Sequence, residues 1–446
     1  MSYQRLSVLF VISTLGFADT NRAQELRAGA AAVVLDATDD LVIGGSIGPG
    51  KAKGQEGTLR ASALVVQDPK GNTVALVACD VLMVERDRLD LAARRIETAT
   101  GIPFDHILIN ATHTHHAPTT VTVHGYRREE AFTKQVEDKI VEAAVKAKER
   151  LGPASASFRL GEESSVGKNS RLLLGDGTIF WIGPKDDAVR PTGPFDPDLP
   201  VLAFRRPDGR NEAILFNHST HTIGTETPGV RSPSYYGLAA QRIEAEKGGT
   251  VLFFSGASGS THNLDVPTKE ATIRIKAAVA EALSNARPLA IARVDGIRKE
   301  IAVKVRVFDE KQDDAAVTAY CEKRSTKPFS DATIDVFRAM RKELASKQGR
   351  ERKTWVQAVL IGEVAFVGVP GEFFTKLGRE IKLRSPYRDT FVFQLANDYV
   401  GYIPDQKAYE LGGYQTWTGL HSWVERGTGE RMVDEAVALL RKLKGD

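Results

Sequence analysis

One segment of this 446-residue chain, residues 74–112, most constrains its fold. Residues 74–84 form an apolar run rich in β-branched side chains, residues 86–100 space their apolar side chains as a helix does, and residues 106–112 form a second apolar run. A strand, a helix and a strand in this order predict a βαβ unit with a right-handed crossover. The residues after the second strand are then expected at the carboxyl end of a sheet, where open α/β sheets place their binding sites.

The rest of the chain also alternates between helical and strand patterns. Helices are predicted over residues 129–151, 268–286 and 432–443, and strands over residues 201–205, 213–216, 250–255 and 391–395, with a hairpin over residues 356–369 that turns at Gly362. The sequence contains no internal repeat and no Gly/Ser-rich or Pro-rich linker. These patterns predict one large α/β domain with mixed β-sheets flanked by helices.

Residues 309–353 differ from the rest because charged and helix-forming side chains dominate them. The stretch Ser325-Thr-Lys-Pro328 interrupts this segment. We interpret residues 309–353 as a helical insertion exposed to solvent rather than as a partner-binding arm.

The first residues have the pattern of a secretory signal peptide. One positive charge precedes an apolar run, and the small residues Ala18 and Ala23 offer cleavage sites. We expect residues 1–23 to be removed and the mature chain, residues 24–446, to be secreted or periplasmic. No later segment approaches the roughly 20 apolar residues of a membrane helix, so no transmembrane helix is expected in the mature chain.

The balance of charge argues against a nucleic-acid partner. The chain carries 60 Lys and Arg against 57 Asp and Glu, and no basic block with interleaved aromatic residues stands out. The two cysteines, Cys79 and Cys321, have no neighbour of ligand type at the spacing of a metal site. Cys79 lies in an apolar run, so a buried free thiol is expected there.

A cluster of histidines follows the second strand of the βαβ unit, in the sequence Asn110-Ala-Thr-His-Thr-His-His116. Side chains alternate along a strand, so His113 and His115 are expected to face one side and His116 the other. Imidazole is a common metal ligand, but an H-x-H pair alone is equally compatible with a metal site and with a loop that contains histidines without binding metal.

Two other strand ends carry polar side chains of ligand type. Residues 214–218 lead to His218 and a Ser/Thr loop, and residues 366–372 lead through a Pro-Gly turn to Glu372. A capping role for His218 and a helix N-terminal position for Glu372 are the alternatives. Together with His113, these residues make a two-histidine, one-carboxylate zinc set with room for a water molecule.

Four motifs in the same order resemble those of the neutral, non-lysosomal ceramidases and their bacterial relatives. The segment Ala111-Thr-His-Thr-His115, followed by Ala117-Pro118, resembles the family's Ala-Thr-His-Thr-His-Ser-Gly-Pro signature. The other three are its second histidine segment at 217–220, its glutamate segment at 369–372 and its tyrosine segment at 395–404, which continues to Gly413-Tyr414. The resemblance extends over residues 28–445, and four ordered motifs are specific where one alone is not.

The resemblance implies a neutral-ceramidase-like catalytic domain with a zinc ion. The implied zinc ligands are His113, His218, Glu372 and Tyr402. His115 is implied as the proton-transfer partner and Tyr414 as a hydrogen-bond donor to the developing oxyanion. Without the resemblance, we would interpret Tyr402 as an aromatic residue at the edge of the core, with its ring packed and its hydroxyl in contact with water.

Arg171, in Gly167-Lys-Asn-Ser-Arg171, resembles the family's Asn-Arg segment, whose arginine lies in the substrate cleft. The alternative for Arg171 is a guanidinium on the surface.

The chain departs from the family at a loop that follows a central strand. The ceramidases have Gly-Asp-Val-Ser-Pro-Asn there, with a serine implicated in amide cleavage, whereas this chain has Gly256-Ala-Ser-Gly-Ser-Thr-His-Asn263. The alignment puts His262 where that serine belongs. Three alternatives follow: water activated by zinc as the nucleophile, His262 as a base or a further metal ligand, and Ser258 or Ser260 as a shifted nucleophile.

Two further departures concern the surroundings of the site. His116 and Ala117 replace the family's Ser-Gly pair, and the β-sandwich that follows the family's catalytic domain is not expected here. The sequence therefore predicts an exported zinc-dependent hydrolase of an amide or related acyl bond. Its substrate would be a small-molecule or lipid N-acyl amide, with a place in lipid or sphingolipid metabolism.

A non-catalytic extracellular binding protein on the same scaffold is the alternative that the altered loop at 256–263 suggests. Other metal hydrolases fit less well. The His-x-His-x-Asp-His motif of metallo-β-lactamases requires Asp where Ala117 stands, and an amidohydrolase barrel places its H-x-H pair on a first strand, much nearer the mature N-terminus.

Overall fold

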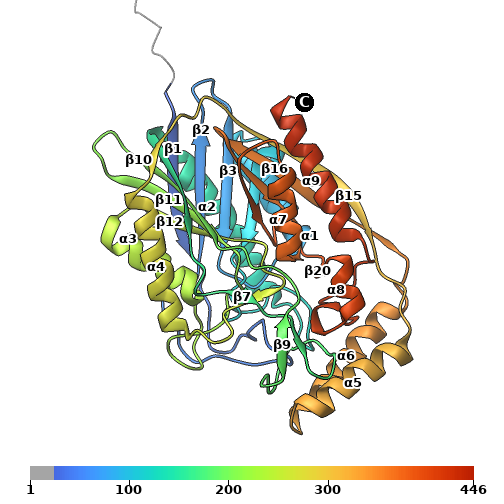
Figure 1. Cartoon of the computed structure of the whole chain (residues 1–446). Helices are drawn as coiled ribbons and strands as arrows, with labels where there is room; N and C mark the ends of the chain where they lie inside the picture. Colours follow the sequence, from blue (N-terminus) through green and yellow to red (C-terminus); the bar gives the residue numbers. More distant parts are fainter. Residues whose placement is uncertain (1–24, 446) are drawn as a thin grey trace, which may run out of the picture.

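The computed structural model describes residues 25–445, and the expected signal peptide, residues 1–23, lies outside the described residues. The chain forms a mixed α/β fold of several sheets covered by helices, as predicted (Figure 1).

The first sheet contains the predicted βαβ unit. Its strand order is β4-β3-β2-β1-β5. The strands are β1 (Arg27–Val34), β2 (Arg60–Gln67), β3 (Thr73–Cys79), β4 (Ile107–Ala111) and β5 (Gly152–Pro153). β3 and β4 run parallel and are joined by α1 (Arg86–Thr100), which confirms the predicted unit, whereas the other pairs are antiparallel. The helices α1 and α2 (Glu130–Glu149) pack together, and α2 lies on β1 and β2.

Two further sheets make up the middle of the molecule. One has the order β12-β11-β10-β6-β14 and the other the order β15-β16-β17-β19. Their strands are β6 (Ser155–Glu162), β10 (Asp198–Arg205), β11 (Asn211–His218), β12 (Thr250–Ser255), β14 (Arg287–Leu289), β15 (Val294–Lys304), β16 (Glu351–Ile361), β17 (Val364–Gly368) and β19 (Asp389–Phe393). The predicted hairpin over residues 356–369 is β16–β17, and its partner β19 runs parallel to β17.

Successive side chains of the first sheet point to opposite faces and pack in two different core clusters. On β2, Ala61, Ala63 and Val65 join the cluster that contains the apolar side chains of α1 and α2. Leu64 and Val66 join a second cluster with side chains of the two middle sheets. Each fully buried Val or Leu there contributes about 1.5–3 kcal/mol. The first sheet therefore packs between a helical layer and the two other sheets.

Four more helices cover the outer faces of the middle sheets. The helices α3 (Ser234–Lys247) and α4 (Thr268–Ser284) pack on the β6–β12 sheet, and α7 (Thr375–Arg384) and α9 (Thr428–Lys444) pack on the β15–β19 sheet. The short elements are β7 (Lys168–Asn169), β8 (Leu172–Leu174), β9 (Ala188–Pro191), β13 (Thr261–His262), β18 (Glu372–Phe373), β20 (Tyr402–Ile403) and α8 (Gln406–Leu411). None of the helices in residues 25–445 combines the length and the apolar character of a membrane-spanning segment.

The expected helical insertion forms two helices, α5 (Glu310–Arg324) and α6 (Phe329–Ala345), at one side of the molecule (Figure 1). Arg341 of α6 is fully buried and pairs with Glu310 and Asp314 of α5. The insertion is not simply solvated, because Phe337 and Met340 of α6 are buried in the main core cluster.

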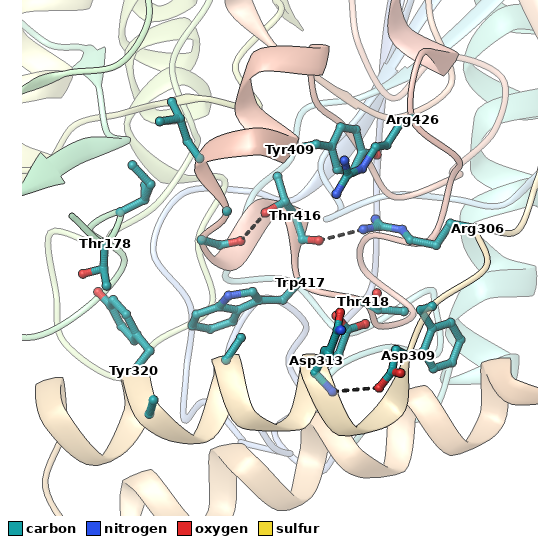
Figure 2. A pocket seen from close by; sticks show the side chains of 18 of the residues that line it. Thr178, Arg306, Asp309, Asp313, Tyr320, Tyr409, Thr416, Trp417, Thr418 and Arg426 are labelled. Atoms are coloured by element: carbon teal, nitrogen blue, oxygen red, sulfur yellow. Dashed lines mark hydrogen bonds between the residues drawn. The ribbon is translucent and has the colours of Figure 1, made fainter. Parts of the chain in front are cut away.

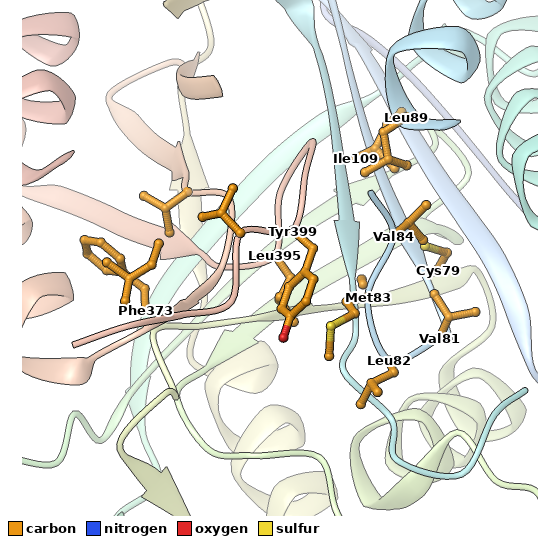
Figure 3. Packing of buried hydrophobic residues seen from close by; sticks show 14 of the residues in the cluster. Cys79, Val81, Leu82, Met83, Val84, Leu89, Ile109, Phe373, Leu395 and Tyr399 are labelled. Carbon is orange, nitrogen blue, oxygen red and sulfur yellow. The ribbon is translucent and has the colours of Figure 1, made fainter. Parts of the chain in front are cut away.

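Two irregular segments complete the core beside the ends of β3 and β19. Residues 81–84, which follow β3, pack in one cluster with Leu395 and Tyr399, and Figure 3 shows them from close by. Cys79 belongs to this cluster as a buried free thiol, as expected, and Cys321 is also free and buried within the described part of the chain. This packing fixes the backbone of residues 81–84, in which the carbonyl oxygens of Val81 and Leu82 accept hydrogen bonds from His113.

Candidate metal centre

Four segments that follow strands bring polar side chains to one place. His113 and His115 follow β4, and His221 follows β11. Glu372 and Tyr402 lie directly opposite each other in the short parallel pair of β18 and β20. Strand ends from the first, second and third sheets thus supply one site, which is why no single segment of the sequence contains it.

The donor atoms of these five residues lie within a few ångströms of one another. The ligand nitrogens of His113, His115 and His221 all lie within 4.8 Å of one another, a group that could hold a metal ion. Oε2 of Glu372 lies 3.3 Å from Nε2 of His113 and 3.2 Å from Nε2 of His221. The Tyr402 hydroxyl lies 3.2 Å from Nε2 of His221.

Hydrogen bonds to the backbone fix the orientation of all three imidazoles. Each ring turns Nδ1 to a carbonyl oxygen. For His113, His115 and His221 in turn, the acceptors are Leu82 at 2.9 Å, Gly45 at 2.9 Å and Ser258 at 2.8 Å. A carbonyl can only accept, so each Nδ1 carries a proton, and in the neutral ring each Nε2 presents its lone pair to the shared centre. This arrangement is typical of histidines that bind a metal through Nε2.

The carboxylate of Glu372 also indicates that a metal ion binds here. Glu372 is 3% exposed, and its Oε2 has no hydrogen-bond partner within residues 25–445. Oε2 of Glu372 faces Nε2 of His113 and Nε2 of His221. With Nδ1 protonated on both rings, the lone pairs of Nε2 and Oε2 face one another, which is unfavourable in a buried site unless a cation lies between them. The five side chains therefore fit a divalent metal ion.

His115 is the member of the group that reaches toward solvent. Its side chain is partly exposed, whereas His113 and His221 are buried. Burial, followed by the nearby His113 and His221, lowers the pKa of His115 well below 6.5. His115 is therefore neutral at neutral pH and can accept a proton or a metal ion at Nε2.

The histidines after β4 converge through a turn, not through strand alternation. The strand ends at Ala111, and His113 has a left-handed backbone with φ of 66°. This conformation is rare for a residue with a Cβ and persists only where the surroundings hold it. The expected pairing of His113 with His115 is present, for this different reason. His116 points away, as expected, and its Nε2 accepts a hydrogen bond from Gly224.

The second histidine of the site is His221 rather than His218. At the end of β11, Nδ1 of His218 lies 2.6 Å from the hydroxyl of Tyr236 on α3, and its Nε2 lies 2.9 Å from the backbone oxygen of Glu163. Both ring nitrogens are occupied on the helical side of the sheet, so His218 cannot turn to the metal group. The turn after β11 then carries His221 into the position that we expected for His218.

Tyr414 lies next to this group, at the centre of an aromatic cluster. Its ring centroid is 5.8 Å from that of Tyr402, and its ring stacks on Trp181 at 4.5 Å with only 3° between the planes. Its hydroxyl lies 3.0 Å from Nε2 of His124, a residue that we did not single out in the sequence. The structure thus places Tyr414 beside the expected ligand Tyr402.

Arg171 is buried, so its surface alternative is excluded. Its side chain is 1% exposed and donates to the backbone oxygens of Ala408 and Gly412 and to Oε1 of Gln415. Burial lowers the pKa of Arg171 to about 10, and the guanidinium stays charged at neutral pH. Ala408 and Gly412 precede Tyr414 and Gln415 follows it, so Arg171 fixes the segment that carries Tyr414. Arg171 also lines a small pocket of about 40 Å³ beside Ser260.

The loop at 256–263 brings His262 beside the metal group. The His262 ring stacks on His221 with 5.9 Å between centroids, and its Nδ1 has no partner among the described residues. Burial, followed by His221 and Lys185, lowers the pKa of His262 to about 3. The hydroxyls of Ser258 and Ser260 are occupied, because the first bonds Gln394 at 2.8 Å and the second bonds Thr375. These serines are therefore poorly placed as nucleophiles.

A cavity of about 1020 Å³ lies apart from the metal group, between α5 and the segment around residues 409–418 (Figure 2). Trp417, Tyr320 and Arg306 line it, and none of the five donor residues does. The side chains of Trp181 and Tyr414 lie between the Trp417 wall and Tyr402. This cavity is therefore separate from the metal group.

Comparisons with known proteins identify the fold. No protein-family profile matches the chain, and no curated protein sequence matches it significantly. The crystal structure of the neutral ceramidase from Pseudomonas aeruginosa superposes with a TM-score of 0.71 and 18% sequence identity, over 94% of this chain and 75% of that one. A ceramidase complexed with C2 gives a TM-score of 0.72 and 17% identity, over 95% of this chain and 76% of that one. The chain therefore has a neutral-ceramidase-like fold, which confirms the fold implied by the sequence motifs.

Proposed function

We propose that the protein is an exported zinc-dependent hydrolase of an amide or related acyl bond in an N-acyl amide. The observation that carries this proposal is that Nε2 of His113 and Nε2 of His221 both face the unpartnered Oε2 of Glu372, with Nε2 of His115 3.4 Å from that of His113. The fold shared with two solved ceramidases supports it.

In this proposal the zinc ligands are His113, His221, Glu372 and Tyr402, and His115 is the proton-transfer residue. Two imidazoles and a carboxylate are ordinary zinc ligands, and the hydroxyl of Tyr402 lies 3.2 Å from Nε2 of His221. Zinc, when bound, polarises a carbonyl oxygen and lowers the pKa of water to about 7.

His115 has the protonation state and the exposure that a general base requires. It is neutral, and its Nδ1 hydrogen bond to Gly45 leaves Nε2 free to accept a proton from the attacking water. The same Nε2 then returns that proton to the nitrogen of the leaving amine. His115→Ala is expected to retain zinc and lose turnover.

Tyr414 is the donor to the oxygen of the tetrahedral intermediate in this proposal. Trp181 stacks on its ring, and Arg171 holds the Gly412 backbone before it and the Gln415 side chain after it, so the hydroxyl has little freedom. A preorganised donor of this kind contributes about 2.7–4 kcal/mol to the barrier reduction.

Water is the nucleophile that the loop at 256–263 leaves available, because Ser258 and Ser260 are held by Gln394 and Thr375. His262 stands beside His221 with an unpartnered Nδ1. We propose that His262 contacts polar atoms of the substrate next to the scissile bond.

The lipid N-acyl amides are the substrate class that the two solved ceramidases suggest, and the expected signal peptide suggests a secreted or periplasmic enzyme of lipid metabolism. A binding protein without turnover is the second candidate, because His262 occupies the place of the family's serine. No nucleic-acid partner is proposed.

One screen separates these two functions. Zinc-loaded protein is incubated with a panel of N-acyl amides that includes ceramide and N-acyl amino acids, and release of the amine is measured. We expect turnover that a chelator and Glu372→Gln abolish and that the exposed control Glu363→Gln retains. Saturable binding of a panel member without turnover would instead establish the binding protein.

A further inference from the structure

His124 and His421 flank Tyr414, and the sequence motifs of the site include neither of them. The hydroxyl of Tyr414 lies 3.0 Å from Nε2 of His124. The backbone oxygen of Tyr414 lies 3.1 Å from Nε2 of His421, whose ring stacks on the Tyr414 ring at 4.9 Å. Both histidines are buried, with 7% and 0% exposure. Tyr414 is thus held at both its backbone and its hydroxyl.

The surroundings of His124 keep this contact in place. Its backbone is left-handed, with φ of 51°, and its N–H donates to the sulfur of Met340 on α6. Its ring lies 5.0 Å from that of His421, on which Phe337 of α6 packs edge-on at 5.2 Å. A non-glycine residue stays in this conformation only where packing fixes it. The helical insertion therefore holds His124 against Tyr414.

The direction of the hydrogen bond between His124 and Tyr414 decides what Tyr414 can do. The phenol has one proton. If Tyr414 donates it to His124, the proton points away from the metal group and cannot stabilise charge there. If His124 donates from Nε2, the phenolic proton stays free to point at the metal group.

The unpartnered atom of His124 indicates which direction holds. Nδ1 of His124 is buried and has no hydrogen-bond partner anywhere in residues 25–445. Burial lowers the pKa of His124 to about 4, so the neutral ring carries a single proton. A proton on Nδ1 would be a buried N–H without an acceptor, which proteins tolerate less well than an unused acceptor. The proton therefore belongs on Nε2.

We propose that His124 is a positioning residue that donates a hydrogen bond from Nε2 to the Tyr414 hydroxyl and so reserves the phenolic proton for the oxygen of the substrate carbonyl. This inference rests on the proposed hydrolase function for its kinetic consequence. Its structural part, the proton on Nε2, is independent of any activity.

The tautomer is tested directly by nitrogen NMR of protein labelled with ¹⁵N-histidine. His421 is an internal reference, because its Nε2 faces a carbonyl oxygen and must carry the proton. The resonances of His124 are assigned by their loss in His124→Gln. We expect His124 to show a protonated Nε2 and an unprotonated Nδ1, as His421 does. A protonated Nδ1 on His124 would overturn the proposal even if the protein had no hydrolase activity.

A double-mutant cycle tests the kinetic consequence. We expect His124→Phe to lower kcat about 10- to 100-fold with little change in KM, because the donor from Tyr414 is then misdirected. His124→Gln keeps an N–H near the position of Nε2 and should retain most of kcat. Tyr414→Phe combined with His124→Phe should be no slower than Tyr414→Phe alone. Zinc content should stay at the wild-type level in all of these variants.

Two results would contradict this account. One is that the losses of His124→Phe and Tyr414→Phe multiply, which would mean that His124 acts independently of Tyr414. The other is that His124→Gln loses as much kcat as His124→Phe. His106→Gln, at a histidine that bonds Thr73 away from the site, controls for the substitution itself. If wild-type protein has no turnover while the tautomer is as expected, the proposed function fails and the positioning of Tyr414 stands.

Discussion

The Oε2 atom of Glu372 lies 3.2 Å from Nε2 of His221 and makes no hydrogen bond with it, and the same oxygen has no hydrogen-bond partner elsewhere in the described chain. The Nδ1 proton of His221 is held by the carbonyl of Ser258, so in the neutral ring two lone pairs face each other across this distance. A metal ion between the two atoms converts this unfavourable contact into two coordinate bonds.

Removing the charge of Glu372 should therefore stabilise the metal-free protein. In Glu372→Gln the amide can donate to Nε2 of His113 or His221 instead of opposing it. We expect chelator-treated Glu372→Gln to unfold in denaturant with a free energy about 1–3 kcal/mol above that of chelator-treated wild type.

The control for this prediction is Glu363→Gln, an exposed residue in the β16–β17 turn, which should change stability by less than about 0.5 kcal/mol. Zinc should stabilise wild type by about 4 kcal/mol at a thousandfold excess over its Kd, and should not stabilise Glu372→Gln. A metal-free Glu372→Gln that is less stable than wild type would show that the carboxylate has a partner of another kind.

The buried histidines should make the protein less stable in weak acid. Burial lowers the pKa of His116 from 6.5 to about 4. Between these two pH values the unfolded chain binds a proton at His116 that the folded chain does not bind, so stability is lost as the pH falls from 6.5 toward 4. The loss from this residue is about 2 kcal/mol, allowing for its partial exposure.

His116→Gln isolates this contribution, because a glutamine oxygen can still accept the hydrogen bond from Gly224. Denaturant unfolding of wild type and variant is compared at pH 7 and at pH 4.5. The difference in stability between the two pH values should be smaller in the variant. Equal pH dependence in both proteins would mean that His116 is protonated in the folded state.

Arg171 should affect turnover through Tyr414 and not through zinc. Arg171→Met removes the donor to the backbone oxygen of Gly412 and to Oε1 of Gln415, at a cost of about 1–3 kcal/mol for each group left unsatisfied, whereas the oxygen of Ala408 keeps the N–H of Gly412. We expect lower kcat, lower thermal stability and unchanged zinc content. Zinc content is measured by atomic emission and stability by thermal unfolding. Loss of zinc from a folded Arg171→Met protein would contradict this role.

Local patterns predicted the scaffold of the site well. The βαβ unit at residues 74–112 and the hairpin at 356–369 have the topology that their periodicity indicates, and α1 has the predicted bounds. The same patterns placed His113 and Glu372 at strand ends, and the structure brings these two side chains within 3.3 Å of each other. Apolar periodicity determines which strand ends meet, because it determines which faces are buried.

The sequence could not distinguish His218 from His221. His218 ends β11 and His221 follows three residues later, and only the tertiary partners Tyr236 and Glu163 show that His218 is occupied. His124 was missed for a similar reason, since its contact with Tyr414 joins residues 290 positions apart. Such partners depend on tertiary packing, and no local spacing signals them.

The most direct test of the metal centre is the zinc content of purified protein and three variants. We expect close to one zinc per chain in wild type and in His218→Gln, and loss of most of the zinc in His113→Ala and His221→Ala. Full zinc in a folded His221→Ala protein, or loss of zinc from a folded His218→Gln protein, would contradict the ligand set proposed for this fold.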